Sequence, residues 1–274
     1  MNRRNFSIAS ASLLLAGYSG IVLAQAPART AVPAKLTIAS AINKAGRQRM
    51  LSQRMAKAYA QLGVGILPER AFKILNDSTT LFESQLAELT SFAPNADIAK
   101  TYAELGQAWR GYKEVLATAP APELGARIQD ANELVLQLAN RGTQELERAS
   151  GTNAGRLVNI SGRQRMLSQR TAMFFMFREW GLPKPVETAL GNVRTEFRAA
   201  LNTLRVDPET TDEIKTQLGL AETQWLFFDA AVEASLKSKA DAVRRQNVAN
   251  SSERILEVFE TVTGLYERNA SARA

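Results

Sequence analysis

The sequence GRQRMLSQR occupies residues 46–54 and returns without a change at residues 162–170, 116 positions later. Each copy carries three arginines. An identical stretch at a fixed separation is typical of an internal repeat, in which each copy belongs to one structural unit. We therefore interpret the rest of the chain as the scaffold that presents these two copies.

The similarity between the two halves extends well beyond the motif. Aromatic, leucine and charged positions recur at separations of 115 to 120 residues, as in Trp109 and Trp225. Clusters of proline and glycine divide each half into four segments with apolar residues at helical spacing. The sequence thus predicts an all-α fold, a tandem repeat of two antiparallel four-helix bundle units over residues 36–150 and 151–274.

The connection between the two halves allows two interpretations. No proline lies between Glu123 and Trp180, so the last segment of the first half is free to continue into the second motif segment. We favour this one long continuous helix. The alternative is a break at residues 150–153, which read Ser-Gly-Thr-Asn, because glycine weakens a helix.

The first 26 residues have the features of a signal peptide. Arg3 and Arg4 precede an apolar run over residues 8–23, and the Ala-Gln-Ala sequence at residues 24–26 fits a cleavage site. The rest of the chain contains no apolar stretch long enough to cross a bilayer. We expect a periplasmic protein without a transmembrane segment after cleavage.

The N-terminal residues also bear on the export route and on where the folded region begins. The two arginines are followed by Asn5 and Phe6, which fits a twin-arginine signal, and an ordinary secretory signal is the alternative. Residues 27–35 contain two prolines and are predicted to form a flexible leader.

The composition excludes several kinds of site. The chain has no cysteine and no histidine, and its formal net charge is +7. Thiolate chemistry, disulfides, imidazole catalysis and most zinc sites are thereby excluded. We therefore expect no enzyme, with no catalytic residue, metal or cofactor. The positive charge suits an anionic partner, and because it is not gathered in runs or tails, that partner is not expected to be nucleic acid.

On a helical wheel, Arg49 lies in the middle of a stripe of small residues that includes Ala45 and Gly46. Gly162 and Arg165 take the same places in the second copy. Small side chains let another helix approach closely, so the guanidinium becomes buried and requires an anion. No acid lies on this face, so the anion has to come from another helix or from a ligand.

A guanidinium presents a planar fork of N–H donors that suits planar oxyanions such as nitrate, nitrite or a carboxylate. Arg49 and Arg165 are therefore the primary candidate ligands, and a pseudo-twofold arrangement of the repeats would place them on opposite sides of one anion. The candidate secondary ligands are Asn43, Asn159, Gln53 and Gln169. The alternative is that all six motif arginines form internal ion pairs.

The other motif arginines lie on a different face of each helix and are expected to hold the bundle together. These structural arginines are Arg47, Arg54, Arg163 and Arg170. Glutamates that both halves retain are candidate partners, namely Glu133, Glu253, Glu147 and Glu267. Contact with a ligand is the alternative role for these arginines. Gln48 and Gln164 are expected to face solvent or a loop.

Residues 41–54 resemble the P-box of nitrate/nitrite sensor kinases of the NarX and NarQ type, and the related N-terminal domain of type IV pili methyl-accepting chemotaxis transducers, the PilJ type. The positions that match the kinase pattern are Ile42, Asn43, Lys44, Ala45, Gly46, Arg49, Met50, Ser52 and Arg54. The resemblance implies that Arg49 and Arg165 contact nitrate and that Gly46 and Gly162 leave space beside the anion.

The resemblance leaves the function open between two hypotheses. Arg47, Gln48 and Gln53 depart from the kinase pattern, so the charge and shape of the pocket differ. The first hypothesis is a periplasmic binding or sensory protein for a small anion, nitrate, nitrite or a similar one, without its own output domain. The alternative is a ligand-free helical adaptor of an envelope, type IV pilus or chemosensory complex, with a protein partner.

Overall fold

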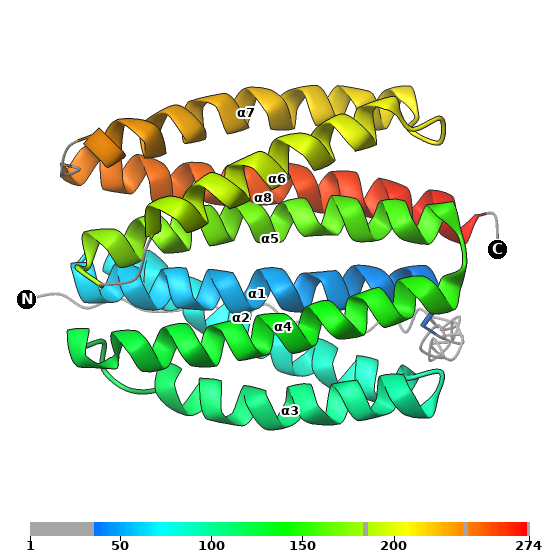
Figure 1. Ribbon diagram of the computed structural model, residues 1–274, viewed down its shortest axis with the longest axis horizontal. Helices are drawn as coiled ribbons and strands as arrows, with labels where there is room; N and C mark the ends of the chain where they lie inside the picture. The colour runs from blue at the N-terminus through cyan, green and yellow to red at the C-terminus, as the bar shows by residue number, and fades with distance from the viewer. Residues whose placement is uncertain (1–35, 183–185, 238–240, 273–274) are drawn as a thin grey trace, which may run out of the picture. The chain divides into compact units, whose positions relative to one another are not determined.

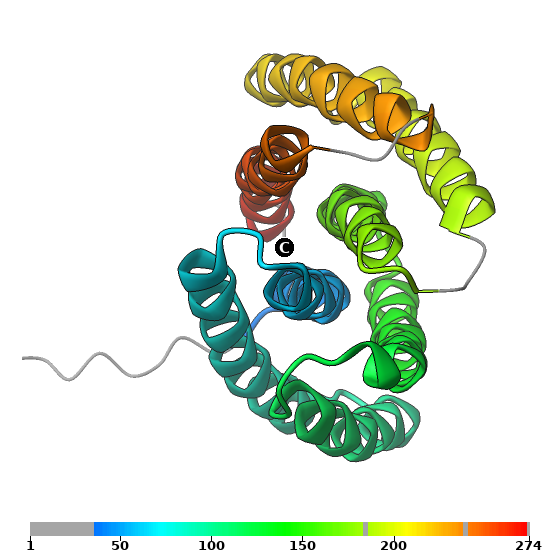
Figure 2. The same ribbon diagram turned by 90° about the vertical axis from the view of Figure 1, so that its left-hand side faces the viewer.

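The two motif helices, α1 (Ile38–Val64) and α5 (Asn153–Glu179), pack against each other at the centre of the structure (Figures 1 and 2). They approach closely at the motif glycines, since a Cβ placed on Gly46 would lie 3.9 Å from the Cα of Gly162. The stripe of small residues therefore serves as the contact face of the two helices, as helix packing with short side chains requires.

The structure is a computed structural model that describes residues 36–182, 186–237 and 241–272. The predicted signal peptide and leader, residues 1–35, lie outside the described residues. Within the described part, all regular structure is helical. The other helices are α2 (Pro68–Phe92), α3 (Ala96–Leu116), α4 (Gly125–Ser150), α6 (Val186–Val206), α7 (Asp212–Lys237) and α8 (Ala242–Ser271), with a short 3₁₀ helix at Pro122–Leu124.

Each half of the chain supplies one set of four helices, and the same helices meet in both sets. In the first half, α2 and α4 pack on α1, and α3 packs on α4; in the second, α6 and α8 pack on α5, and α7 packs on α8. The outer pairs α2–α3 and α6–α7 lie on opposite sides of the central helices (Figure 2). Because α1 also touches α8 and α4 touches α5, the two repeats lie side by side around one core.

Each repeat carries its own aromatic cluster at equivalent positions. Phe82 stacks on Trp109 with ring centroids 4.2 Å apart, and Phe197 stacks on Trp225 at 3.6 Å. These four rings are buried, and the pairs fix α2 to α3 and α6 to α7. Large buried rings contribute strongly to the stability of such interfaces. The two repeats are therefore equivalent in their cores as well as in their motifs.

The prediction of one long helix through the junction of the repeats is wrong. α4 ends at Ser150, and Gly151 adopts a left-handed conformation with a φ of 61°. Thr152 then caps α5, because its hydroxyl accepts a hydrogen bond from the amide of Gly155 at 3.0 Å. A left-handed glycine followed by a capping threonine ends one helix and begins the next without a proline, and α5 returns alongside α4 (Figure 1).

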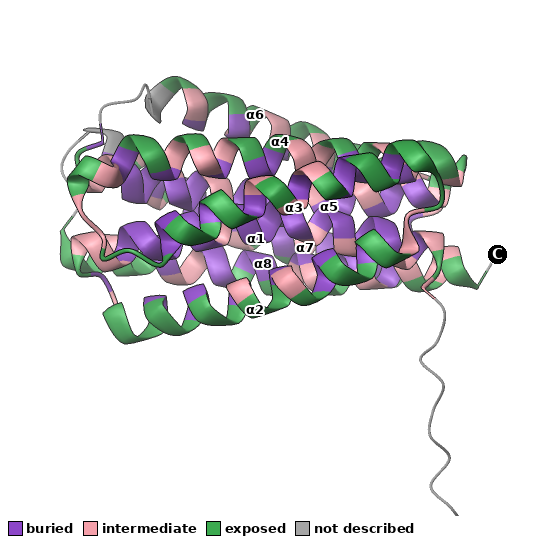
Figure 3. Cartoon of the chain, turned by 90° about the horizontal axis from the view of Figure 1, so that it is seen from below, coloured by how far each residue is buried: buried purple, intermediate pink, exposed green. Residues whose placement is uncertain are grey.

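The two central helices are enclosed by the other helices (Figure 3). Gln48 and Gln164 are fully buried, so the expectation that they face solvent or a loop is wrong. The wheel could not show this, because it ranks the faces of one helix and not the number of neighbours around it. Among the described residues, none of the helices is both long enough and apolar enough to span a bilayer.

Gln164 leads to a prediction about stability. Neither its Nε2 nor its Oε1 has a hydrogen-bond partner within the described protein, whereas Nε2 of Gln48 donates to the carbonyl of Phe82 at 3.2 Å. Gln164→Met keeps the length of the side chain and removes two unpaired polar atoms. We expect the free energy of unfolding, measured with urea, to rise by about 1–2 kcal/mol.

The matched control is Gln48→Met. Unlike Gln164→Met, it removes a hydrogen bond, the one from Nε2 to the carbonyl of Phe82. We expect this variant to be less stable than Gln164→Met. Equal losses of stability in both variants would show that Gln164 has polar partners in solution and would refute the prediction.

Candidate functional site

Arg49 lies near the middle of α1 with its side chain completely buried. Its Nη1 donates to Oδ1 of Asn140 on α4 at 3.0 Å, and its Nη2 donates to Oδ1 and to the main-chain oxygen of Asn159 on α5 at 2.7 and 3.3 Å. Its Nε has no partner within the described protein. Burial, followed by the nearby charges of Arg163 and Arg165, lowers the pKa of Arg49 to about 9.

Arg165 takes the equivalent place on α5 and is equally buried, but it has a carboxylate partner. Its Nη1 donates to Oε2 of Glu260 on α8 at 2.7 Å, and its Nη2 donates to the main-chain oxygen of Asn43 at 3.1 Å. Arg47 binds the same carboxylate, with 3.0 Å between its Nε and Oε1. Burial alone would raise the pKa of Glu260, yet Arg165 and Arg47 hold it at about 2.

The repeat relates these two sets of contacts. Asn140 stands 120 positions before Glu260, and Nη1 of Arg163 donates to Oδ1 of Asn140 at 3.0 Å, as Arg47 donates to Glu260. We name the first set the Arg49 half-site, consisting of Arg49, Arg163 and Asn140. We name the second set the Arg165 half-site, consisting of Arg165, Arg47 and Glu260. The central acceptor is a neutral amide in the first half-site and a carboxylate in the second.

The motif glycines make room for both buried guanidinium groups. A Cβ on Gly46 would lie 3.2 Å from Nη2 of Arg49 and 3.5 Å from Nη2 of Arg165, and a Cβ on Gly162 would lie 3.0 Å from Nη2 of Arg165. The structure therefore brings Arg49 and Arg165 to the same crossing of α1 and α5. Each of them nevertheless has its own acceptors on neighbouring helices.

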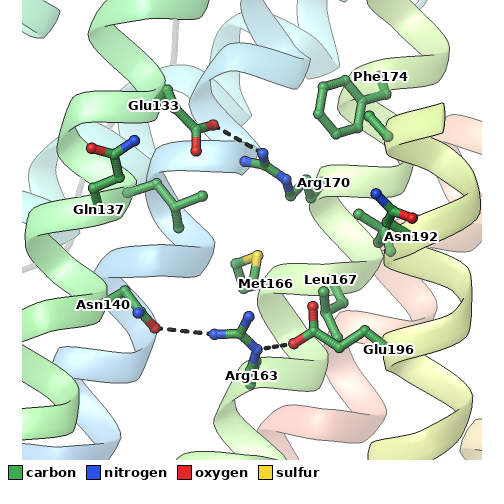
Figure 4. A pocket seen from close by; sticks show the side chains of 13 residues that line it. Glu133, Gln137, Asn140, Arg163, Met166, Leu167, Arg170, Phe174, Asn192 and Glu196 are labelled. Atoms are coloured by element: carbon green, nitrogen blue, oxygen red, sulfur yellow. Dashed lines mark hydrogen bonds and ion pairs between the residues drawn. The ribbon is translucent and has the colours of Figure 1, made fainter. Parts of the chain in front are cut away.

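A groove of about 360 Å³ runs beside the Arg49 half-site, between α4 and α6 and over α5. Arg163, Asn140 and Glu196 lie at one end of it, and Met166 and Leu167 lie between them and the other end (Figure 4). Arg163 is 34% exposed and pairs through its Nε with Glu196. Since Asn140 accepts from both Arg163 and Arg49, it connects the groove with the buried guanidinium.

A comparison with protein families finds one family that matches the chain twice. The family is described as the N-terminal domain of type IV pili methyl-accepting chemotaxis transducers, PilJ, and it matches residues 35–138 and 146–251. Each match contains one copy of the motif, and together they cover more than half of the chain. This chain belongs to the PilJ family.

Membership of the PilJ family makes this chain a helical module related to the sensory domains of chemotaxis transducers. The family description is that of a transducer domain and names no reaction. The curated proteins contain no match to the chain, and neither do the solved structures. The assignment of the two half-sites therefore rests on the contacts described above.

The remaining motif arginines join the two PilJ repeats. Nε of Arg54 on α1 donates to Glu253 on α8 at 3.0 Å, and Nη2 of Arg170 on α5 donates to Glu133 on α4 at 2.9 Å. Lys57, completely buried, also pairs with Glu253. The two glutamates are equivalent in the repeats, but side-chain exposure is 7% for Glu253 and 43% for Glu133.

The two candidate glutamines are buried and fully engaged in the bundle. Nε2 of Gln53 donates to Oδ1 of Asn132 at 2.9 Å, and its Oε1 accepts from Arg170 at 3.0 Å. Nε2 of Gln169 donates to the main-chain oxygen of Ser252 at 2.9 Å, and its Oε1 accepts from Lys57 at 2.7 Å. Gln53 of α1 therefore connects to α4 and α5, and Gln169 of α5 connects to α8 and α1.

The two candidate asparagines stay beside the buried arginines. Asn159 accepts from Arg49 and donates through Nδ2 to Glu147, and Asn43 accepts from Arg165 and donates to Glu267. The acidic partners are the glutamates that both repeats retain. The bond to Glu147 therefore orients the Asn159 amide, whose Oδ1 faces Arg49, whereas Arg165 is met by the main-chain oxygen of Asn43.

Sequence reasoning missed Asn140, Glu260 and Glu196. The first two lie on the fourth helix of each repeat, and their spacing of 120 residues is the one that also relates Glu133 to Glu253. Aligning the sequences of the two fourth helices would have shown that Asn140 of the first repeat corresponds to Glu260 of the second. Nothing in the sequence indicates that Glu196 of α6 pairs with Arg163.

Proposed function

We propose that this chain is a periplasmic sensory module that binds a small oxyanion, such as nitrate or nitrite, at the Arg49 half-site and acts on a separate protein partner. The observation that carries the proposal is a completely buried guanidinium, Arg49, whose acceptors in the described residues are all neutral. A buried charge without a bonded counterion costs several kcal/mol, and a bound anion offsets that cost.

Several further observations support this assignment. The family is one of sensory transducer domains, and the signal peptide predicted for residues 1–26 agrees with action outside the cytoplasm. Arg163 and Asn140 line a groove, so an anion in this groove meets two residues of the half-site without passing through the aromatic core. Gly46 keeps side-chain atoms away from Nη2 of Arg49.

Binding acts as a signal if it changes the relative position of helices. The Arg49 half-site takes one residue from each of α1, α4 and α5, so an anion held there joins three helices across the boundary between the repeats. An anion that binds one arrangement of these helices more tightly shifts the population toward it. A partner protein that contacts the outer helices is then able to detect the shift.

The test is a thermal unfolding series with nitrate and nitrite against chloride at the same ionic strength. For the wild-type protein we expect the melting temperature to rise with nitrate or nitrite, because binding to the folded state alone stabilises it. Arg49→Met is expected to abolish the rise. Equal melting temperatures of the wild-type protein in nitrate, nitrite and chloride would refute the proposal.

A second candidate function, a ligand-free helical adaptor, is favoured by apolar side chains on the surface of α7. Leu226 is 60% exposed and its neighbour Phe227 is 71% exposed, and adjacent apolar side chains on the surface suit a protein contact better than scattered single ones do. This function predicts that a Phe227→Glu variant loses a partner captured from periplasm by the wild-type protein. It also predicts that anions have no specific effect on either variant.

A further inference from the structure

Glu260 is the acceptor at the centre of the Arg165 half-site, and the neutral Asn140 takes the equivalent position in the Arg49 half-site. Its carboxylate accepts from Nη1 of Arg165 at 2.7 Å and from both Nε and Nη2 of Arg47. In the Arg49 half-site, Oδ1 of Asn140 accepts from Nη1 of Arg49 and from Nη1 of Arg163, both at 3.0 Å. The donor residues correspond and the acceptors differ in charge, and Arg163 in addition pairs through its Nε with Glu196.

We propose that Glu260 is a built-in equivalent of the ligand. The Arg165 half-site is permanently filled by the chain's own carboxylate, so the protein binds one anion per chain and not two. That anion is a planar monoanion of carboxylate size, held between Arg49 and Arg163 in the place that corresponds to the Glu260 carboxylate. This inference rests on the function proposed above and adds the stoichiometry, the place and the class of the ligand.

The way in which Glu260 is held defines the ligand class. Two guanidinium groups converge on one planar carboxylate, and a fork of N–H donors matches planar oxyanions in geometry. Glu147 and Glu196 lie close enough to Arg49 to act on its charge, and their negative charges oppose a dianion. Nitrate, nitrite, formate and acetate fit these conditions better than sulfate or hydrogen phosphate does.

An amide at residue 140 suits a half-site that binds an external anion. A side-chain amide presents an oxygen acceptor on one side and an NH₂ donor on the other. Without a ligand, the oxygen of Asn140 faces the two arginines. When an anion enters from the groove between α4 and α6, a turn of this amide lets its NH₂ group donate to the anion. A carboxylate at residue 140 has no donor to offer and would repel the anion.

The test is isothermal titration with nitrate on the wild-type protein, Asn140→Asp and Glu260→Gln. Asn140→Asp places a carboxylate at the position of the amide with no change in size, and we expect it to weaken nitrate binding at least about tenfold, as like charges in contact do. Glu260→Gln opens the second half-site, and we expect nitrate stoichiometry to rise from one to two per chain. Acetate in place of nitrate is expected to give the same pattern.

Thermal unfolding in buffer without nitrate or acetate gives a second readout. Asn140→Asp is expected to melt at a higher temperature than the wild-type protein, and Glu260→Gln at a lower one. Unchanged nitrate binding by Asn140→Asp, or a single site in Glu260→Gln, would overturn the inference and leave the proposed function standing. A wild-type protein that binds neither nitrate nor acetate would overturn both.

Discussion

Glu253→Gln is expected to lower the free energy of unfolding by about 3–5 kcal/mol, as breaking a buried ion pair on one side does. The side chain of Glu253 is 7% exposed and pairs with both Arg54 and the completely buried Lys57. Glutamine keeps the shape of the side chain but leaves two cations without their carboxylate. Urea unfolding at neutral pH measures the loss.

The repeat offers a matched control for this change. Glu133 is the equivalent residue of the first repeat and pairs with Arg170, but its side chain is 43% exposed. Glu133→Gln is expected to cost less than about 1 kcal/mol, since an exposed ion pair contributes little. Lys57→Met, which copies Met173 of the second repeat, is expected to restore part of the stability that Glu253→Gln loses. Equal losses in the two glutamate variants would contradict the account.

The same ion pairs give Glu253 a defined pH dependence. Burial tends to raise the pKa of Glu253, but Lys57 and Arg54 outweigh it and lower the pKa from 4.5 to about 2. Because the folded state holds its proton less tightly than the unfolded state, the carboxylate stabilises the fold fully above pH 4.5. That contribution is lost as the pH falls toward 2. The difference in stability between the wild-type protein and Glu253→Gln should shrink over this range.

Arg49→Met and Arg165→Met are expected to change stability in opposite directions, although the two arginines are equivalent in the repeat and equally buried. In the absence of anions, Arg49→Met should raise the free energy of unfolding by about 1–3 kcal/mol, because it removes a buried charge with neutral partners. Arg165→Met should lower it by about 1–3 kcal/mol, because Glu260 then loses one of its two cations.

This comparison is carried out by urea unfolding at low ionic strength, with the double variant Arg165→Met/Glu260→Gln as control. The control removes the carboxylate together with its partner and is expected to recover part of the loss. A destabilisation of similar size in both single variants would mean that Arg49 has a carboxylate partner in solution. That result would contradict the proposal that Arg49 binds an external anion.

Much of the fold follows from the sequence because helices and repeats leave local signals. The helical spacing, the proline and glycine breaks and the equivalence of Trp109 with Trp225 indicate two four-helix units side by side or end to end. The junction at Gly151 is the exception, since glycine weakens a helix without having to end it. The break combines the left-handed Gly151 with the capping hydroxyl of Thr152, and the absence of proline made a continuous helix equally compatible with this stretch.

The site could be predicted only in part, for a similar reason. The stripe of small residues around Arg49 predicts burial, and the identity of the motif copies predicts that Arg165 is buried too. Identical motifs cannot reveal different partners. The difference arises on the fourth helices, where Asn140 stands opposite Glu260 in the repeat, and only packing shows which guanidinium each of them meets.

A crystal structure of the protein with nitrate, compared with one grown in chloride, shows directly whether the Arg49 half-site holds the anion. We expect planar density for one nitrate in each chain, within hydrogen-bonding distance of Arg49 and Arg163, and a Glu260 carboxylate that still binds Arg165. Nitrate on Arg165 with Glu260 displaced, or an Arg49 half-site with no nitrate at a concentration that saturates binding, would contradict it.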